Sequence, residues 1–227
     1  MAALEITNET LDALIAKITE VESMEAFIEK YRTAYKAALE DDNIISPAEQ
    51  EGLDAIKEEI TRQLGVEPIM IDSADFSAQI RKRYYWTNVP VDMNYTPSDI
   101  VFRDIEYHHN YRVVDFSKYG DTLRVNKEGN CWSWDTSGKG YYSQQSRARS
   151  KDIKMNTVPA SGGDKNNIYL GNCTYRKLHP IEAERLQTLP DNYTDCIKSL
   201  TKQIGLCGNG WTVDVIAHIL KGLTTQN

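Results

Sequence analysis

Gln79, Arg81 and Arg83 occupy alternate positions and lead into the aromatic, β-branched run YYWTNV. In an extended strand, alternate side chains point to one side, so the pattern predicts one amide and two guanidiniums facing a common site. Arginine suits anions and the carbonyl oxygens of bases, because its planar guanidinium presents several donors in a fixed fork. An ordinary surface arginine pair ahead of a strand explains the same residues, and the pattern alone leaves both interpretations open.

The run Gly208 to Trp211, Gly-Asn-Gly-Trp, precedes an apolar segment with helical spacing. As a turn before a helix, it would place backbone N–H groups and a flat indole at the helix N-terminus. That arrangement suits a ligand with an adenine ring or a carboxylate. A glycine turn followed by a core tryptophan is the alternative.

Charge divides the chain into an acidic head and a body that is locally basic. Residues 1–63 hold 15 acidic and six basic side chains, whereas residues 138–177 hold eight basic and two acidic ones. Such an asymmetry indicates a two-part protein with one basic surface, the pattern expected where nucleic acid binds. A solvated basic loop is the plainer interpretation of residues 138–177.

Composition limits the other functional classes. Hydrophobic residues make up 41% of the 227 residues, which is ordinary for a soluble globular protein. We expect no membrane span, no signal peptide and a cytoplasmic location, because no apolar run is long enough and MAALEITNET lacks a basic start. The four cysteines form no CxxC pair, so no metal site is expected.

The elements that must position these residues follow from apolar spacing. Residues 1–63 predict three helices, the third beginning at Pro47 with Ser46 as N-cap. After Gly65, PIMID and RYYWTNV predict strands, and residues 98–175 predict a loop-rich region with few strands. Two further helices are predicted, at 180–187 and 212–223.

Three segments, taken in order, resemble motifs VIII, IX and X of the DNA cytosine-5 methyltransferases, and most resemble the bacterial and phage members similar to the mammalian de novo enzymes. The matching segments are Gln79–Arg83, Glu184–Thr194 (ERLQTLPDNYT) and Gly208–Trp211 with its following helix. The stretch between, with GKGYYSQQSRA and KMNTVPASGGDKNNIYL, looks like that family's target-recognition region. The likeness covers roughly residues 56–224.

The resemblance implies a fold class of α/β (α+β in isolation). We expect a partial S-adenosylmethionine-dependent methyltransferase fold with a loop-rich β recognition lobe, preceded by an N-terminal helical segment. The implied divisions are an acidic three-helix module at 1–63, a motif VIII hairpin at 64–97, a target-recognition region at 98–175 and a closing segment with motifs IX and X at 176–227.

The family's catalytic motifs are not found in this sequence. No cysteine follows a proline, and no Phe-x-Gly-x-Gly turn or Glu-Asn-Val motif occurs. The likeness therefore implies the C-terminal half of a split DNA cytosine-5 methyltransferase, inactive alone and completed by a second chain that carries the nucleophile. The alternative is a catalytically dead methyltransferase derivative, such as a phage protein, that binds DNA or another protein.

By this likeness, Arg83 would contact the flipped cytosine, with Arg81 and Gln79 supporting it. Asn209, Gly210 and Trp211 would border S-adenosylmethionine once the partner chain is bound. Double-stranded DNA would be contacted by a set of polar and basic residues: Ser143, Gln144, Gln145, Arg147, Arg149, Lys151, Arg176 and Lys177. We expect the protein to act in the cytoplasm of a bacterium or a phage-infected host, as part of a restriction-modification system.

Overall fold

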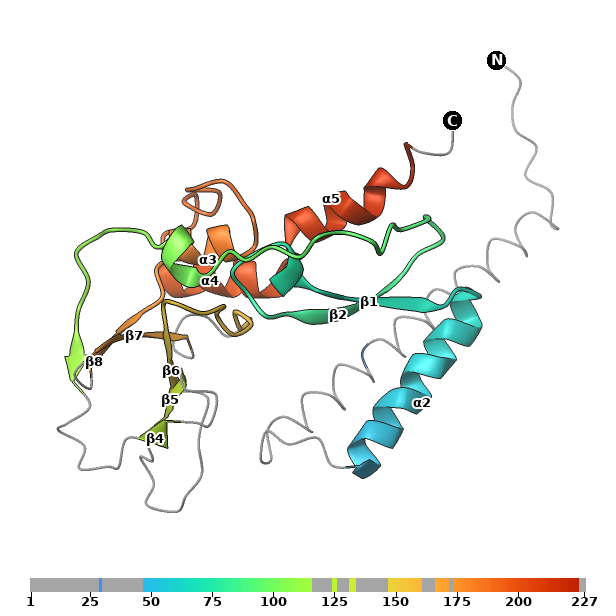
Figure 1. Ribbon diagram of the computed structural model, residues 1–227, viewed down its shortest axis with the longest axis horizontal. Coiled ribbons are helices and arrows are strands. Elements are labelled where there is room, and N and C mark those ends of the chain that lie inside the picture. The colour runs from blue at the N-terminus through green and yellow to red at the C-terminus, as the bar shows by residue number, and fades with distance from the viewer. Residues whose placement is uncertain are drawn as a thin grey trace. The chain divides into compact units, whose positions relative to one another are not determined.

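The computed structural model describes most of the chain beyond residue 46 and divides it into two units, Met1–Pro68 and Ile69–Asn227 (Figure 1). The described residues are 29, 47–115, 124–125, 131–133, 147–160, 166–171 and 174–224. The first two of the three helices expected in residues 1–63, and the N-cap Ser46, lie outside these residues, except that Glu29 is helical.

In the first unit, the helix expected from Pro47 is present as α2, Pro47–Leu64. Leu53 and Ile60, seven positions apart and so on one helix face, are both buried. Leu64, the last residue of the helix, is 47% exposed. Gly65 ends the helix with a φ of +66°, and its N–H donates to the carbonyl of Thr61 at 2.8 Å. This left-handed glycine is a common way to terminate a helix.

The two strands expected after Gly65 are present as β1, Pro68–Asp72, and β2, Lys82–Trp86, which form a two-stranded sheet. A short 3-10 turn, η1, spans Ser73–Asp75 between them. Helix α5, Val213–Lys221, packs on this sheet through a small core of Ile71, Val215 and Ile219. The expected final amphipathic helix is therefore confirmed.

The recognition region forms more regular structure than the sequence predicts. Its strands make a six-stranded sheet in the order β3-β8-β7-β6-β5-β4, in which β6 and β7 are parallel and the other neighbours are antiparallel. The bounds are β3 Val114–Asp115, β4 Arg124–Val125, β5 Cys131–Ser133, β6 Arg147–Ser150, β7 Asn167–Gly171 and β8 Thr174–Lys177. The strands are two to five residues long, too short for a clear alternating pattern in the sequence.

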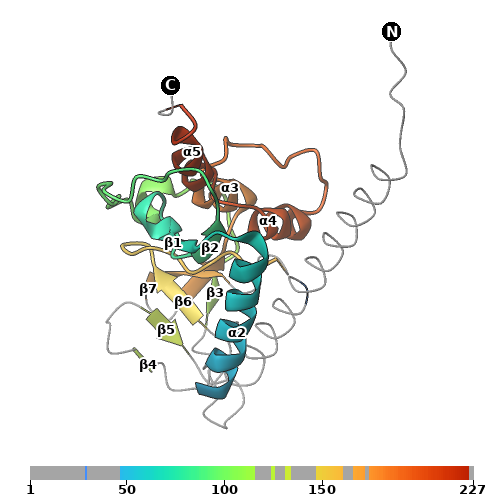
Figure 2. The same cartoon turned by 90° about the vertical axis from the view of Figure 1, so that its right-hand side faces the viewer.

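Helices α3, Pro180–Leu186, and α4, Leu200–Asn209, lie between this sheet and α5 in both views (Figure 2). Helix α3 confirms the short helix expected after Pro180, whereas α4 was not anticipated. Both helices contribute to the main core, together with the 3-10 turn η2, Phe102–Ile105, and the segment that follows β6. The core residues are Ala78, Phe102, Met155, Val158, Ile168, Leu178, Ala183, Leu186, Ile204 and Cys207.

The described residues thus form a mixed α/β protein with two small sheets, as the coarse fold prediction states. None of the helices among them is at once long and apolar enough to cross a bilayer.

Candidate functional site

The side chain of Gln79 is fully buried where three segments of the chain meet. Its Nε2 donates to the carbonyl of Leu186 at 3.4 Å and to Oε1 of Gln187 at 3.3 Å. Its Oε1 accepts the N–H of Val158 at 2.8 Å. The sequence placed Gln79 at a ligand site. In the structure this amide instead lies inside the protein, where it joins Val158 of the target-recognition region to the end of α3.

Gln187 extends this connection to the link between α4 and α5. Its Nε2 donates to the carbonyl of Cys207 at 2.6 Å. Thr212 Oγ1 lies 2.8 Å from Gln187 Oε1 and 2.8 Å from Ser73 Oγ. A hydroxyl both donates and accepts, so Thr212 can donate to the amide oxygen while accepting from Ser73. The sequence analysis assigned no role to Gln187 or Thr212, although Gln187 falls within the segment that resembles motif IX.

Arg81 is buried and holds the C-terminal turn of α4. Its Nη2 donates to the carbonyl of Gly208 at 3.2 Å and to that of Gly210 at 2.9 Å. The last carbonyls of a helix have no partner within the helix, and a cation at that end also interacts favourably with the helix dipole. Nη1 of Arg81 is buried and has no hydrogen-bond partner among the described residues. Arg81 therefore has one donor group that the described part of the chain does not use.

Arg83, in β2, is half-buried, and its Nη1 donates to the carbonyl of Lys82 at 2.7 Å. Burial, followed by the nearby charge of Arg83, lowers the pKa of Arg81 to about 10. Burial raises the pKa of Tyr85, and the two arginines partly offset that rise. No ion pair to either arginine is found in the part of the chain that the structure describes. The two guanidiniums thus form a cationic pair at the start of β2.

The sequence suggested that the Gly-Asn-Gly-Trp run forms a turn at the start of a helix. In the structure most of this run instead ends a helix, α4. Gly208 and Asn209 are the last residues of α4, Gly210 is its C-cap, and Thr212 is the N-cap of α5. Only Trp211 lies between the caps, and it is 66% exposed. The first N–H groups of α5 are already engaged, since Val213 donates to Gln187 and Asp214 donates to Thr188.

A cavity of about 470 Å³ lies beside Trp211. Tyr193, 64% exposed, also lines it, so two aromatic rings lie at its surface. The lining residues are Gln187, Leu189, Tyr193, Thr194, Cys196, Ile197, Leu206, Cys207, Gly210, Trp211, Val213 and Ile216. None of them carries a formal charge at neutral pH, so the cavity suits a flat, neutral ring and offers nothing to pair with an ionised group.

The cavity wall is held in place by a buried carboxylate. Oε1 of Glu184 accepts the N–H of Thr194 at 2.7 Å and its hydroxyl at 2.6 Å, and Oε2 accepts the N–H of Asn192 at 2.7 Å. Burial, and secondly the charge of Glu184, raises the pKa of Cys207 to about 12. The thiol of Cys207 is therefore protonated at neutral pH and is not a nucleophile.

The residues expected to contact DNA fall into three groups. Ser143, Gln144 and Gln145 lie outside the described residues, as does the side chain of Arg147, whose backbone belongs to β6. Arg149, Lys151 and Lys177 lie at or near the surface. Lys177 is exposed, with its Nζ 5.7 Å from the ring centre of Tyr175. The structure does not place the full set on one surface.

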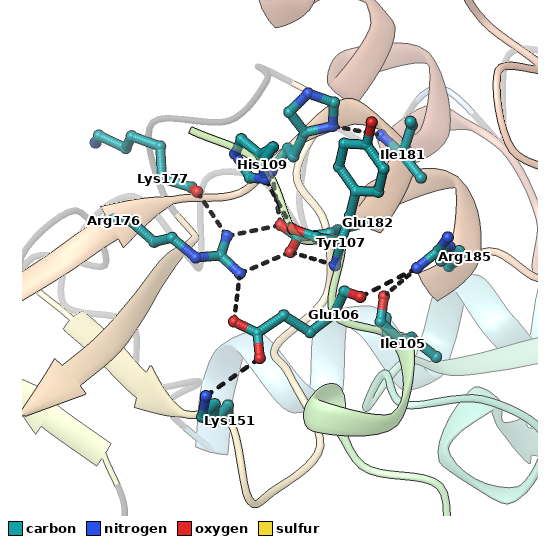
Figure 3. A network of polar contacts seen from close by, with 11 residues as sticks. Ile105, Glu106, Tyr107, His109, Lys151, Arg176, Lys177, Ile181, Glu182 and Arg185 are labelled. Atoms are coloured by element: carbon teal, nitrogen blue, oxygen red, sulfur yellow. Dashed lines mark hydrogen bonds and ion pairs between the residues drawn. The ribbon is translucent and has the colours of Figure 1, made fainter. Parts of the chain in front are cut away.

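Arg176 has an internal position instead of a surface one. Its guanidinium is fully buried and pairs with Glu182 through two hydrogen bonds of 2.7 and 2.8 Å. It also donates to Glu106 at 3.1 Å, as Figure 3 shows. In this arrangement Arg176 joins β8 to α3 and is not accessible to a DNA phosphate.

Within the described residues, no group of three or more His, Cys, Asp or Glu side chains is placed to hold a metal ion. In a comparison with protein-family models, the model described as C-5 cytosine-specific DNA methylase matches residues 93–225. That span covers more than half of the chain and includes the six-stranded sheet, α3, the cavity and α5.

Proposed function

Because the chain belongs to the C-5 cytosine-specific DNA methylases, we propose that it is the DNA-recognition subunit of a split DNA cytosine-5 methyltransferase. In this proposal it contributes the recognition lobe, the arginine pair and one wall of the cofactor site. A second chain contributes the Pro-Cys nucleophile, the glycine-rich cofactor turn and the catalytic glutamate. The chain alone does not methylate DNA.

The chemistry explains why a second set of residues is needed. A thiolate must add to C6 of the cytosine so that C5 becomes nucleophilic, while a carboxyl group engages the ring at N3. The target base must leave the duplex and enter a closed pocket. None of the four cysteines in this sequence follows a proline, and burial keeps the Cys207 thiol protonated.

The observation that carries the proposal is the Arg81–Arg83 pair. Burying a cation without a counter-charge is costly, and the described residues provide no carboxylate to either guanidinium. A flipped base and a carboxylate of the second chain would together satisfy the pair. Arg83 would contact the base and the carboxylate, and Arg81, anchored to Gly208 and Gly210, would support it.

S-adenosylmethionine, the methyl donor that this family uses, fits the cavity in part. When bound, it supplies the methyl group for transfer to C5. Trp211 and Gly210 line a neutral, largely apolar space that suits its adenine ring, with Asn209 exposed beside them. The charged methionine part finds no ionised partner in this lining, so in the proposal the second chain binds that part.

Reconstitution tests the proposal directly. The purified chain, a candidate second chain with the Pro-Cys motif, and their mixture are each incubated with duplex DNA and labelled S-adenosylmethionine. We expect label on cytosine C5 only in the mixture. Label transferred by this chain alone would refute the split arrangement.

A matched pair of variants then tests the arginine site. Arg83→Ala should cut the activity of the mixture at least roughly tenfold, which corresponds to about 1.4 kcal/mol of transition-state stabilisation. Lys82→Ala is the control, because Lys82 is exposed and points to the opposite side of the same strand. Equal losses of methyl-transfer activity in both variants would contradict a special role for Arg83.

One observation favours the second candidate, a non-catalytic protein derived from a methyltransferase that binds DNA or another protein. The side chain of Gln79 and Nη2 of Arg81 are engaged within the chain, as in a self-contained module. If no second chain restores methyl transfer while duplex binding persists, this candidate replaces the split enzyme.

A further inference from the structure

Glu106 lies between two cations that differ in how firmly they are held (Figure 3). Its Oε1 accepts from Nη2 of Arg176 at 3.1 Å, and its Oε2 lies 3.2 Å from Nζ of Lys151. Glu106 follows η2, whereas Lys151 follows β6, so the tertiary structure brings this carboxylate to the basic segment 138–177. The sequence alone gives no sign of this pairing.

The Arg176 side of the network is fixed. Arg176 is fully buried and keeps two short hydrogen bonds to Glu182, which is also fully buried. The side chain of Glu106 is only 9% exposed. Two further hydrogen bonds hold the backbone around it, because the Glu182 carboxylate accepts the N–H of Tyr107 and Arg185 donates to the carbonyl of Glu106. The carboxylate of Glu106 therefore cannot follow a departing partner.

The Lys151 side can be released. The side chain of Lys151 is 38% exposed and reaches Glu106 at the end of a flexible four-carbon stem. Solvent screens a lysine that is partly exposed, so the ion pair holds Lys151 weakly and a DNA phosphate can compete for the ammonium group. When Lys151 leaves, Glu106 keeps its hydrogen bond from Arg176, so its carboxylate is not left without a donor, and Arg176 then serves both Glu106 and Glu182.

We propose that Glu106 is a specificity-determining residue that competes with DNA phosphates for Lys151. This inference rests on the proposed role of Lys151 in DNA contact. Phosphate contacts by lysine give sequence-independent, salt-dependent affinity. By neutralising Lys151 until the DNA is seated closely enough to displace it, Glu106 lowers non-specific binding more than specific binding.

The test measures binding of the full chain to a labelled 24-base-pair duplex of arbitrary sequence, by fluorescence anisotropy at several salt concentrations. Glu106→Gln keeps the size and an oxygen for Arg176 but removes the charge that holds Lys151. We expect affinity to rise about threefold at low salt, and the slope of log K against log salt to steepen by roughly 0.9, the value for one additional phosphate contact.

Two further variants make the test specific. Asp104→Asn removes one negative charge from the 3-10 turn η2, which Glu106 follows. The exposed side chain of Asp104 accepts the N–H of Val101 and pairs with no cation among the described residues. It should leave the salt slope unchanged. Glu106→Gln combined with Lys151→Met should bind no more tightly than Lys151→Met alone, and thermal melts should show that all variants are folded.

The outcomes separate this inference from the proposed function. Binding by the wild type with no change in Glu106→Gln, or an equal gain in Asp104→Asn, would overturn the competition and leave the DNA-recognition role intact. Absence of binding by the wild type and by Glu106→Gln alike would overturn the DNA-recognition role, and the inference with it.

Discussion

The side-chain amides of Gln79 and Gln187 lie 3.3 Å apart, although 108 positions separate them in the sequence. Gln187 in turn contacts Thr212 and the carbonyl of Cys207. The segments that resemble motifs VIII, IX and X therefore share one buried polar network. Because buried polar groups must be paired, each segment fixes the position of the other two.

Gln79→Ala should lower the free energy of unfolding by roughly 2–3 kcal/mol, because the N–H of Val158 and the amide of Gln187 lose buried partners. Arg83→Ala should change it by no more than about 0.5 kcal/mol, as for other substitutions near the surface. Urea denaturation followed by circular dichroism measures both. A loss for Arg83→Ala as large as that for Gln79→Ala would show that Arg83 is a structural residue.

Gly208→Ala should destabilise the protein by about 1–3 kcal/mol, the usual cost of overpacking. A Cβ at Gly208 would lie 2.4 Å from the carbonyl carbon and oxygen of Pro159, which are backbone atoms and cannot move aside cheaply. Gly210→Ala is the matched control, since its Cβ would meet its nearest neighbours at 3.5 Å and its φ is −74°. Thermal melts that show equal losses would contradict the close approach of α4 to Pro159.

Glu184→Gln should loosen the cavity wall at residues 191–195. The new amide nitrogen would face a backbone donor, either that of Asn192 or that of Thr194, so one buried hydrogen bond is lost at a cost of about 1–3 kcal/mol. Hydrogen exchange of these amides should accelerate. Asp191→Asn, which alters only a partly exposed pair with Arg185, should leave the Thr194 amide protected. Unchanged protection in Glu184→Gln would show that packing alone holds the loop.

The protein should lose stability as the pH falls below about 7, in part through His179. Burial, and secondly the neighbouring His109, lowers the pKa of His179 from its ordinary 6.5; Arg176 acts in the same direction, and Glu182 and Glu184 oppose it. In acid the unfolded chain therefore takes up this proton first, so the free energy of unfolding falls with pH below 6.5.

The structure gives this titration a local cause. Nδ1 of His179 accepts the N–H of Ile181 at 3.2 Å, and a protonated imidazole cannot accept. His179→Asn keeps an N-cap acceptor and removes the titration, so the slope of stability between pH 7 and 5 should become shallower. His108→Asn, at an exposed position, is the control. Denaturation midpoints measured across this range check the prediction, and parallel slopes for His179→Asn and the wild type would refute it.

Local pattern was enough to identify several parts of this protein. The strands at PIMID and RYYW, the helix after Pro180 and the final helix follow from residue type and spacing, which act within a few positions of the chain. The relation to cytosine-5 DNA methylases was also visible in the sequence, and the family match to residues 93–225 confirms it. Helix α4 was missed because Gly205 and Gly208 lower the helical propensity of its sequence.

Only the tertiary structure decided what the polar side chains do. Arg176, expected at the DNA, is buried between Glu182 and Glu106, and Gln79 is an internal connector. Alternation along a strand shows which residues share a face, but whether that face meets solvent or another segment depends on distant partners. For Arg81, those partners are carbonyls 127 and 129 positions away, and no local pattern encodes contacts at that separation.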